Sequence, residues 1–141
     1  SEVDKFYFLV LRQLSTKAGF LRASWMQIAS NVERLSDRIE SIVELCSHVD
    51  KETLKKDKRM AESCNRLKNL YIKVIDTLKN KNPSKANDII NEIEILEIDD
   101  KKQLDELLYK KTDPHIILIY NNFNSIGEHI SEIGEATVNL F

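Results

Sequence analysis

The stretch Leu21–Cys46, which reads LRASWMQIASNVERLSDRIESIVELC, decides the fold of this chain. Its apolar side chains recur at alternating spacings of four and three residues, which places them on one face of an α-helix. The pattern continues for more than three heptads and therefore predicts one long helix with a single apolar seam. The seam residues are Leu21, Trp25, Ile28, Val32, Leu35, Ile39, Ile42 and Cys46.

Four further helices are expected around this stretch. Apolar residues at helical spacing predict them over 2–14, 51–80, 84–108 and 114–140. Polar clusters and prolines between these segments favour turns and helix starts. The fourth helix carries Asp99 and Asp100 within its apolar pattern, so a kink or local fraying is one expectation at that point.

The composition fits one helical domain. Among 141 residues there are only three glycines and two prolines, too few for the turns of a sandwich or barrel. Hydrophobic residues make up 42% of the chain and charged residues 31%, so it can bury a core. We therefore expect an all-α fold, an up-down bundle whose antiparallel helices pack their seams against one another.

The charge and hydropathy of the chain exclude several classes of function. The formal net charge is −2, so no overall positive field attracts nucleic acid or an anionic membrane. Apolar runs such as Ile116–Tyr120 are too short to span a bilayer, and Ser1–Lys5 lacks the basic start of a signal peptide. Cys46 and Cys64 form no disulfide framework. We expect a cytoplasmic protein with both thiols reduced and packed in the core.

The chain contains an internal repeat. Residues 32–44 align with residues 123–135 at one constant offset, and their seam positions coincide. The first predicted helix aligns less closely with the fourth. This order predicts that 1–48 are the last two helices of one three-helix unit and that 49–141 form a complete second unit.

Short motifs lie at matching places in these units. VDKFY at 3–7 and RQL at 12–14 are followed by ERLSD at 33–37 and SIVE at 41–44. They resemble the V-D-R-x-Y…R-Q-L and E-R-I-G-D…N-I-x-E patterns of the PhoU family of phosphate-uptake regulators. The resemblance implies a tandem pair of three-helix bundles, of which the first helix is missing here.

The second unit matches the same family only in part, through SIGEH at 125–129 and IGE at 133–135. The agreement in the first helix is most similar to archaeal members. Some of these carry an N-terminal DNA-binding domain of the AbrB type, which the resemblance implies to be absent from this chain.

Outward-facing acids are the candidate metal ligands. Carboxylates four residues apart on a helix lie one above the other and can share a hard cation, and Glu33 and Asp37 have this spacing. The PhoU resemblance implies an iron or zinc cluster on such acids. The candidate ligands are Asp4, Glu33, Asp37, Glu97 and Glu128, and the first three are the better set because Asn124 replaces an acid in the second unit. Solvated surface charge is the alternative interpretation of all five.

We expect a regulator, not an enzyme, that acts by protein–protein contacts. The resemblance implies a phosphate transporter, a sensor kinase or the transcriptional apparatus as partner. A structural scaffold without metal is one alternative. A carboxylate-bridged, metal-dependent helical enzyme is another, although such a site needs inward acids and a Glu-x-x-His motif that the sequence lacks. Without the first helix, Val10, Trp25 and Ile28 are expected to expose an apolar patch, and we expect a dimer.

Overall fold

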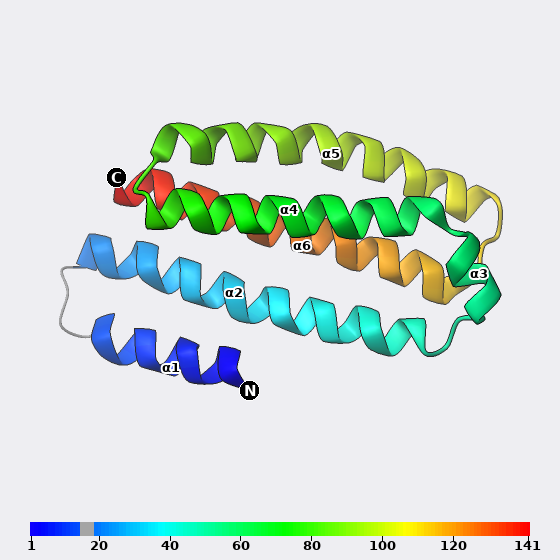
Figure 1. Ribbon diagram of the computed structural model, residues 1–141, viewed down its shortest axis with the longest axis horizontal. Coiled ribbons are helices and arrows are strands. Elements are labelled where there is room, and N and C mark those ends of the chain that lie inside the picture. Colours follow the sequence, from blue (N-terminus) through cyan, green and yellow to red (C-terminus); the bar gives the residue numbers. More distant parts are fainter. Residues whose placement is uncertain (15–18) are drawn as a thin grey trace.

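The computed structural model is an all-α bundle (Figure 1). It describes the backbone of residues 1–14 and 19–141 and the side chains of residues 1–9 and 21–141. Val10, which the sequence places in an apolar patch, lies outside the described side chains. The helices are α1 (Glu2–Leu14), α2 (Gly19–Cys46), α3 (Lys51–Lys56), α4 (Lys58–Lys79), α5 (Pro83–Tyr109) and α6 (Pro114–Leu140).

Helix α6 is the centre of the bundle. It packs against α2, α5 and α4, while α1 packs against α2 and α4 packs against α5. The long helices α4, α5 and α6 reverse direction at each connection, and α2 runs antiparallel to α6 (Figure 1). The predicted all-α bundle is therefore confirmed. In the part of the chain that the structure describes, no helix is long and apolar enough to cross a membrane.

Helix α6 is buried over a wide face because three helices contact it. The sequence predicts a seam of Ile119, Phe123, Ile126, Ile130, Ile133, Thr137 and Leu140, and all of these are buried except Leu140, which is half-buried. Two glycines, Gly127 and Gly134, also lie on this buried face. A Cβ atom on Gly127 would lie 3.7 Å from Ile93 Cγ2 and 3.9 Å from Leu67 Cδ2, whereas one on Gly134 would lie 3.1 Å from Ile90 Cγ1.

Gly127→Ala is expected to raise the free energy of unfolding by about 0.5–1 kcal/mol, because alanine favours a helix over glycine by about that amount. The new methyl group makes ordinary van der Waals contacts. Gly134→Ala should raise the free energy of unfolding by less, since Ile90 must move to make room for the new methyl group. Urea denaturation of both variants tests this order, and a Gly127→Ala protein less stable than the wild type would contradict it.

The prediction of the third helix is wrong in one respect, because the structure has two helices in its place. We expected one helix over 51–80, but the backbone of Asp57 has φ −84° and ψ 82°, outside the helical range. Its side chain instead caps α4 by accepting a hydrogen bond from the backbone N–H of Met60 at 2.9 Å. Val49 is buried and Leu54 packs against the core, so α3 closes one end of the bundle. The N-cap preference of aspartate explains the break.

The other predicted helix boundaries agree with the structure. Asn82 and Asp113 cap α5 and α6 through side-chain oxygens that accept backbone N–H groups, and a proline begins each helix. Helix α5 continues unbroken past Asp99 and Asp100, so the local fraying that was one expectation there does not occur. Asp99 is exposed, whereas Asp100 is half-buried near Arg66 and Arg59, whose charges offset part of the rise that burial causes in the pKa of Asp100.

The buried faces of α2 and α4 differ from their predicted seams. On α2, Ile28 and Leu35 are buried, but Ile39 is 48% exposed. On α4, Cys64 was expected in the core and is exposed, while Leu70 is buried in its place. The reason is that α2 and α4 both pack on α6, so the sides that they turn toward each other stay partly open.

Candidate functional site

The predicted acids of the first unit come together where α1 lies beside α2. Asp4 and Asp37 are exposed and Glu33 is half-buried. Partial burial raises the pKa of Glu33, and the neighbouring carboxylates of Asp37 and then Asp4 raise that pKa further. Asp4 is also held by the Ser1 hydroxyl, which donates to its Oδ2 atom at 2.9 Å. The three acids thus share one outer surface and repel one another.

The predicted acids of the second unit also come together, across the contact between α5 and α6. Glu97 and Glu128 line one surface pocket of about 210 Å³, whose other lining residues are Ser131, Glu132 and Glu135. Burial raises the pKa of Glu97, and the charge of Glu128 is the next cause of that rise. Each of the two helix pairs therefore carries acids on its outer face.

Iron or zinc on either group of acids stays a prediction. Within 1–9 and 21–141, no three His, Cys, Asp or Glu side chains are grouped closely enough to hold one metal ion. Protein sites for zinc or iron ordinarily use three or more such ligands.

Glu97→Gln is expected to stabilise the protein at pH 7. The raised pKa means that the folded state binds this proton more tightly than the unfolded state, so ionisation costs stability as the pH rises through the folded pKa. The amide removes that cost, by less than about 1 kcal/mol because the side chain is partly solvated. At about pH 3 the carboxyl is protonated in both states, so the gain should vanish.

Thermal melting at both pH values measures this effect. Glu106→Gln, which changes an exposed glutamate on the same helix, is the matched control. A gain of equal size at pH 3 and pH 7 would show that the charge of Glu97 is not the cause.

A row of polar side chains between α2 and α6 was not predicted from the sequence. Asn31, only 2% exposed, donates from Nδ2 to the carbonyl of Gln27 at 2.8 Å, and its Oδ1 lies 3.0 Å from His129 Nδ1. Gln27 Nε2 donates to the carbonyl of Glu132 at 3.3 Å. Burial lowers the pKa of His129. Paired polar groups inside an apolar seam fix the register of two helices, here that of α2 on α6.

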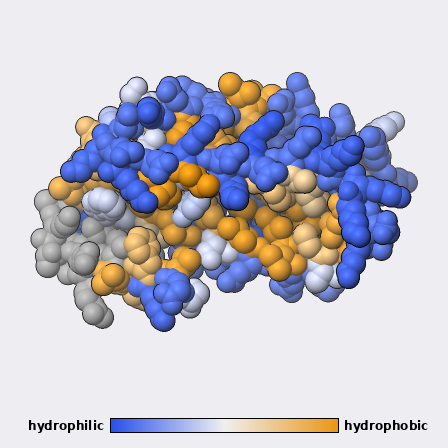
Figure 2. Space-filling view, in the orientation of Figure 1, coloured by the Kyte–Doolittle hydropathy of each residue, from blue (hydrophilic) through white to orange (hydrophobic). Residues whose placement is uncertain are grey.

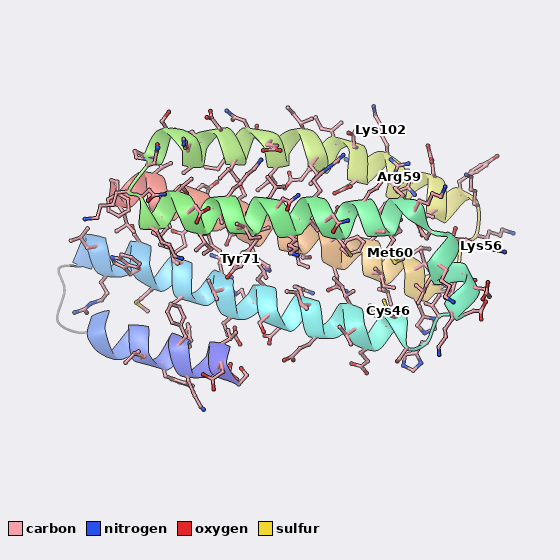
Figure 3. The ribbon with its side chains drawn as sticks, viewed as in Figure 1. Cys46, Lys56, Arg59, Met60, Tyr71 and Lys102 are labelled. Carbon is pink, nitrogen blue, oxygen red and sulfur yellow. The ribbon has the colours of Figure 1, made fainter. Side chains whose placement is uncertain are left out.

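An apolar groove opens between α2 and α4, and we call it the α2–α4 groove. It holds about 460 Å³, with Phe123 and Ile126 of α6 among its lining residues. Val43 of α2 also lines it and is 67% exposed. Tyr71 lines the side of α4 and lies between α4 and α2 in Figure 3. Figure 2 shows hydrophobic surface along this side of the bundle, between hydrophilic side chains.

The α2–α4 groove corrects the predicted apolar patch. Of the residues expected to form that patch, Ile28 is 3% exposed and Trp25 is half-buried against the core. The open apolar surface instead includes Ile39 and Val43, further along α2.

The chain matches none of the protein families with which it was compared. Curated proteins and solved structures likewise give no match.

Proposed function

We propose that this protein is a PhoU-like regulator of phosphate uptake or phosphate signalling, which acts in the cytoplasm through protein–protein contacts and without catalysis of its own. The α2–α4 groove carries this proposal. Its walls expose large apolar side chains, including Ile39 at 48% and Val43 at 67%. Contiguous exposed apolar surface of this kind is typical of a protein interaction site.

The arrangement of the helices supports the same proposal. Helix α1 packs on α2 as α5 packs on α6, and the two pairs join through the contact of α2 with α6. The acids that the PhoU resemblance selects are gathered on the outer face of each pair. By that resemblance, the partner is a phosphate transporter, a sensor kinase or the transcriptional apparatus.

Phosphate uptake by cells that lack the gene tests the proposed function. In phosphate-rich medium, wild-type cells should reduce uptake, whereas cells without the gene should keep it high. A plasmid copy of the wild-type gene should restore the reduction. Cells that reduce uptake equally well with and without the gene would overturn the proposal.

Metal analysis tests the second implication of the resemblance, that iron or zinc binds Asp4, Glu33 and Asp37. Protein purified without chelator is then expected to contain near-stoichiometric metal, which Asp37→Ala should lose. Asp88→Ala, which removes an exposed aspartate on α5, is the matched control and should keep the metal. Wild-type protein free of metal would contradict the metal prediction and leave the contact function standing.

A further inference from the structure

We propose that a pocket between α2 and α6 binds a phosphate group, either free or as a monoester, on the side chains of Arg34 and Arg38. The pocket holds about 430 Å³, and its described lining residues are Arg34, Asp37, Arg38, Ser41 and His129. None of these five residues lines the α2–α4 groove. The inference therefore concerns a separate site and goes beyond the proposed contact function.

Two arginines give the pocket its positive charge. Arg34 and Arg38 are four residues apart on α2, so their side chains lie one above the other on the same face of the helix. Both are exposed, and neither makes an ion pair or a hydrogen bond within the described part of the chain. A guanidinium group can direct two parallel N–H bonds at two phosphate oxygens. Two such groups match the charge of a phosphate monoester, which is close to −2 at about pH 7.

Ser41 supplies a further hydrogen-bond donor. Its Oγ atom accepts a hydrogen bond from Nδ2 of Asn122 at 3.4 Å. Among the described residues, the Ser41 hydroxyl donates to no other group, so its proton is available to an anion in the pocket. Asn122 is buried on α6, and its Nδ2 also donates to the carbonyl of Leu118 at 3.0 Å. Helix α6 therefore holds the Ser41 side chain in place.

His129 forms the wall of the pocket on the side of α6, and its ring is fixed. Nδ2 of Asn31 donates to the carbonyl of Gln27 at 2.8 Å, so Oδ1 of Asn31 faces the ring. This oxygen accepts a hydrogen bond from Nδ1 of His129 at 3.0 Å. A wall that is already ordered lowers the entropy cost of binding a ligand against it.

Asp37 is the acid among the described lining residues, and its charge opposes anion binding. It lies near Glu33, and it makes no ion pair with either arginine in the described part of the chain. Removal of this charge should therefore strengthen phosphate binding. Asp37 is also a predicted metal ligand, so Asp37→Asn separates two ways of holding phosphate. Phosphate held by the arginines should bind more tightly to this variant, whereas phosphate held by a metal on Asp37 should be lost.

Titration of ¹⁵N-labelled protein, followed by the chemical shifts of its backbone amides, tests the proposal. The probes are sodium phosphate and O-phosphoserine at about pH 7, with sodium chloride keeping the ionic strength constant. We expect saturable shifts at residues 34–41 and 129, with a Kd of about 1 mM or below for the better probe. Arg34→Ala and Arg38→Ala should each weaken binding about tenfold, because each removes charged hydrogen bonds. Arg66→Ala, which removes an exposed arginine on α4, is the matched control and should bind like the wild type.

The comparison of the two probes identifies the source of the phosphate group. Tighter binding of sodium phosphate assigns the pocket to the free ion, and tighter binding of O-phosphoserine assigns it to a monoester. A wild type that shows no saturable shift with either probe would overturn the proposal. Binding that both arginine variants retain in full, or that Asp37→Asn abolishes, would also overturn it.

These results are separable from the proposed function. A protein that binds neither probe, from a gene whose deletion abolishes the control of phosphate uptake, overturns the phosphate pocket alone. A protein that binds phosphate through Arg34 and Arg38, from a gene whose deletion leaves uptake control intact, overturns the regulator alone.

Discussion

Ile130→Ala is expected to lower the free energy of unfolding by about 3–4 kcal/mol. Ile130 is fully buried on α6, the helix that α2, α4 and α5 all contact. Truncation removes apolar contacts and leaves a cavity, and neighbours held on three sides cannot close it fully. Urea denaturation followed by circular dichroism measures the loss.

Ile98→Ala is the matched control, because Ile98 is the same residue type on a helix but is 60% exposed. Its effect should stay within about 0.5 kcal/mol. If Ile130→Ala were no more destabilising than Ile98→Ala, α6 would not be the central helix of the bundle.

Asp57→Ala is expected to cost about 2–3 kcal/mol of stability, because this aspartate has two structural partners. Its Oδ1 accepts from the backbone N–H of Met60 at 2.9 Å and from the Tyr120 hydroxyl at 3.0 Å. Burial and the charge of Asp57 raise the pKa of Tyr120, so the hydroxyl remains a donor. Alanine would remove the cap of α4 and leave the hydroxyl of the buried Tyr120 without its partner.

A double-mutant cycle isolates the bond between the two side chains. Tyr120→Phe alone should cost about 1 kcal/mol, because it removes the hydroxyl and leaves the cap in place. In the variant Asp57→Ala/Tyr120→Phe, the loss in free energy of unfolding should be smaller than the sum of the two single losses, since both substitutions remove the same hydrogen bond. Strictly additive losses would show that the bond between Asp57 and Tyr120 contributes nothing.

The buried residues of a helix were predictable from the sequence where its apolar side chains face a single neighbouring helix, or where the helix lies at the centre of the bundle. The spacing of Phe123, Ile126 and Ile130 places them correctly, because α6 is covered on several sides and any apolar position on that face is buried. The break at Asp57 was missed because an aspartate is compatible both with a solvated helix face and with an N-cap. The position of Val49 against the core, which only the folded structure shows, identifies Asp57 as an N-cap and not as a residue on a solvated helix face.

The candidate site was predictable in part. Helix spacing places Glu33 beside Asp37, and the packing of α5 on α6 brings Glu97 near Glu128. The α2–α4 groove was not predicted, since periodicity does not say which of two helices on α6 leaves its flank open. Val43, an apolar residue one position beyond the seam, is the signal that could have indicated it.

The polar row of Asn31 and His129 depends on the register of α2 against α6, which no single helix encodes. Asn31 lies beside the apolar seam of α2, and only the position of α6 determines that it is buried. Contacts between helices far apart in sequence therefore account for most of what sequence reasoning missed.

We propose that this protein contacts its regulatory partner through the α2–α4 groove. Phosphate uptake in cells whose only copy of the gene carries Ile39→Asp/Val43→Asp tests it most directly, with Ile95→Asp/Ile98→Asp as the matched pair of exposed apolar changes on α5. We expect cells with the groove variant, which circular dichroism should show to be folded, to keep phosphate uptake high in phosphate-rich medium, while cells with the α5 variant reduce uptake normally. Cells with the groove variant that reduce phosphate uptake normally would contradict the proposed role of the groove.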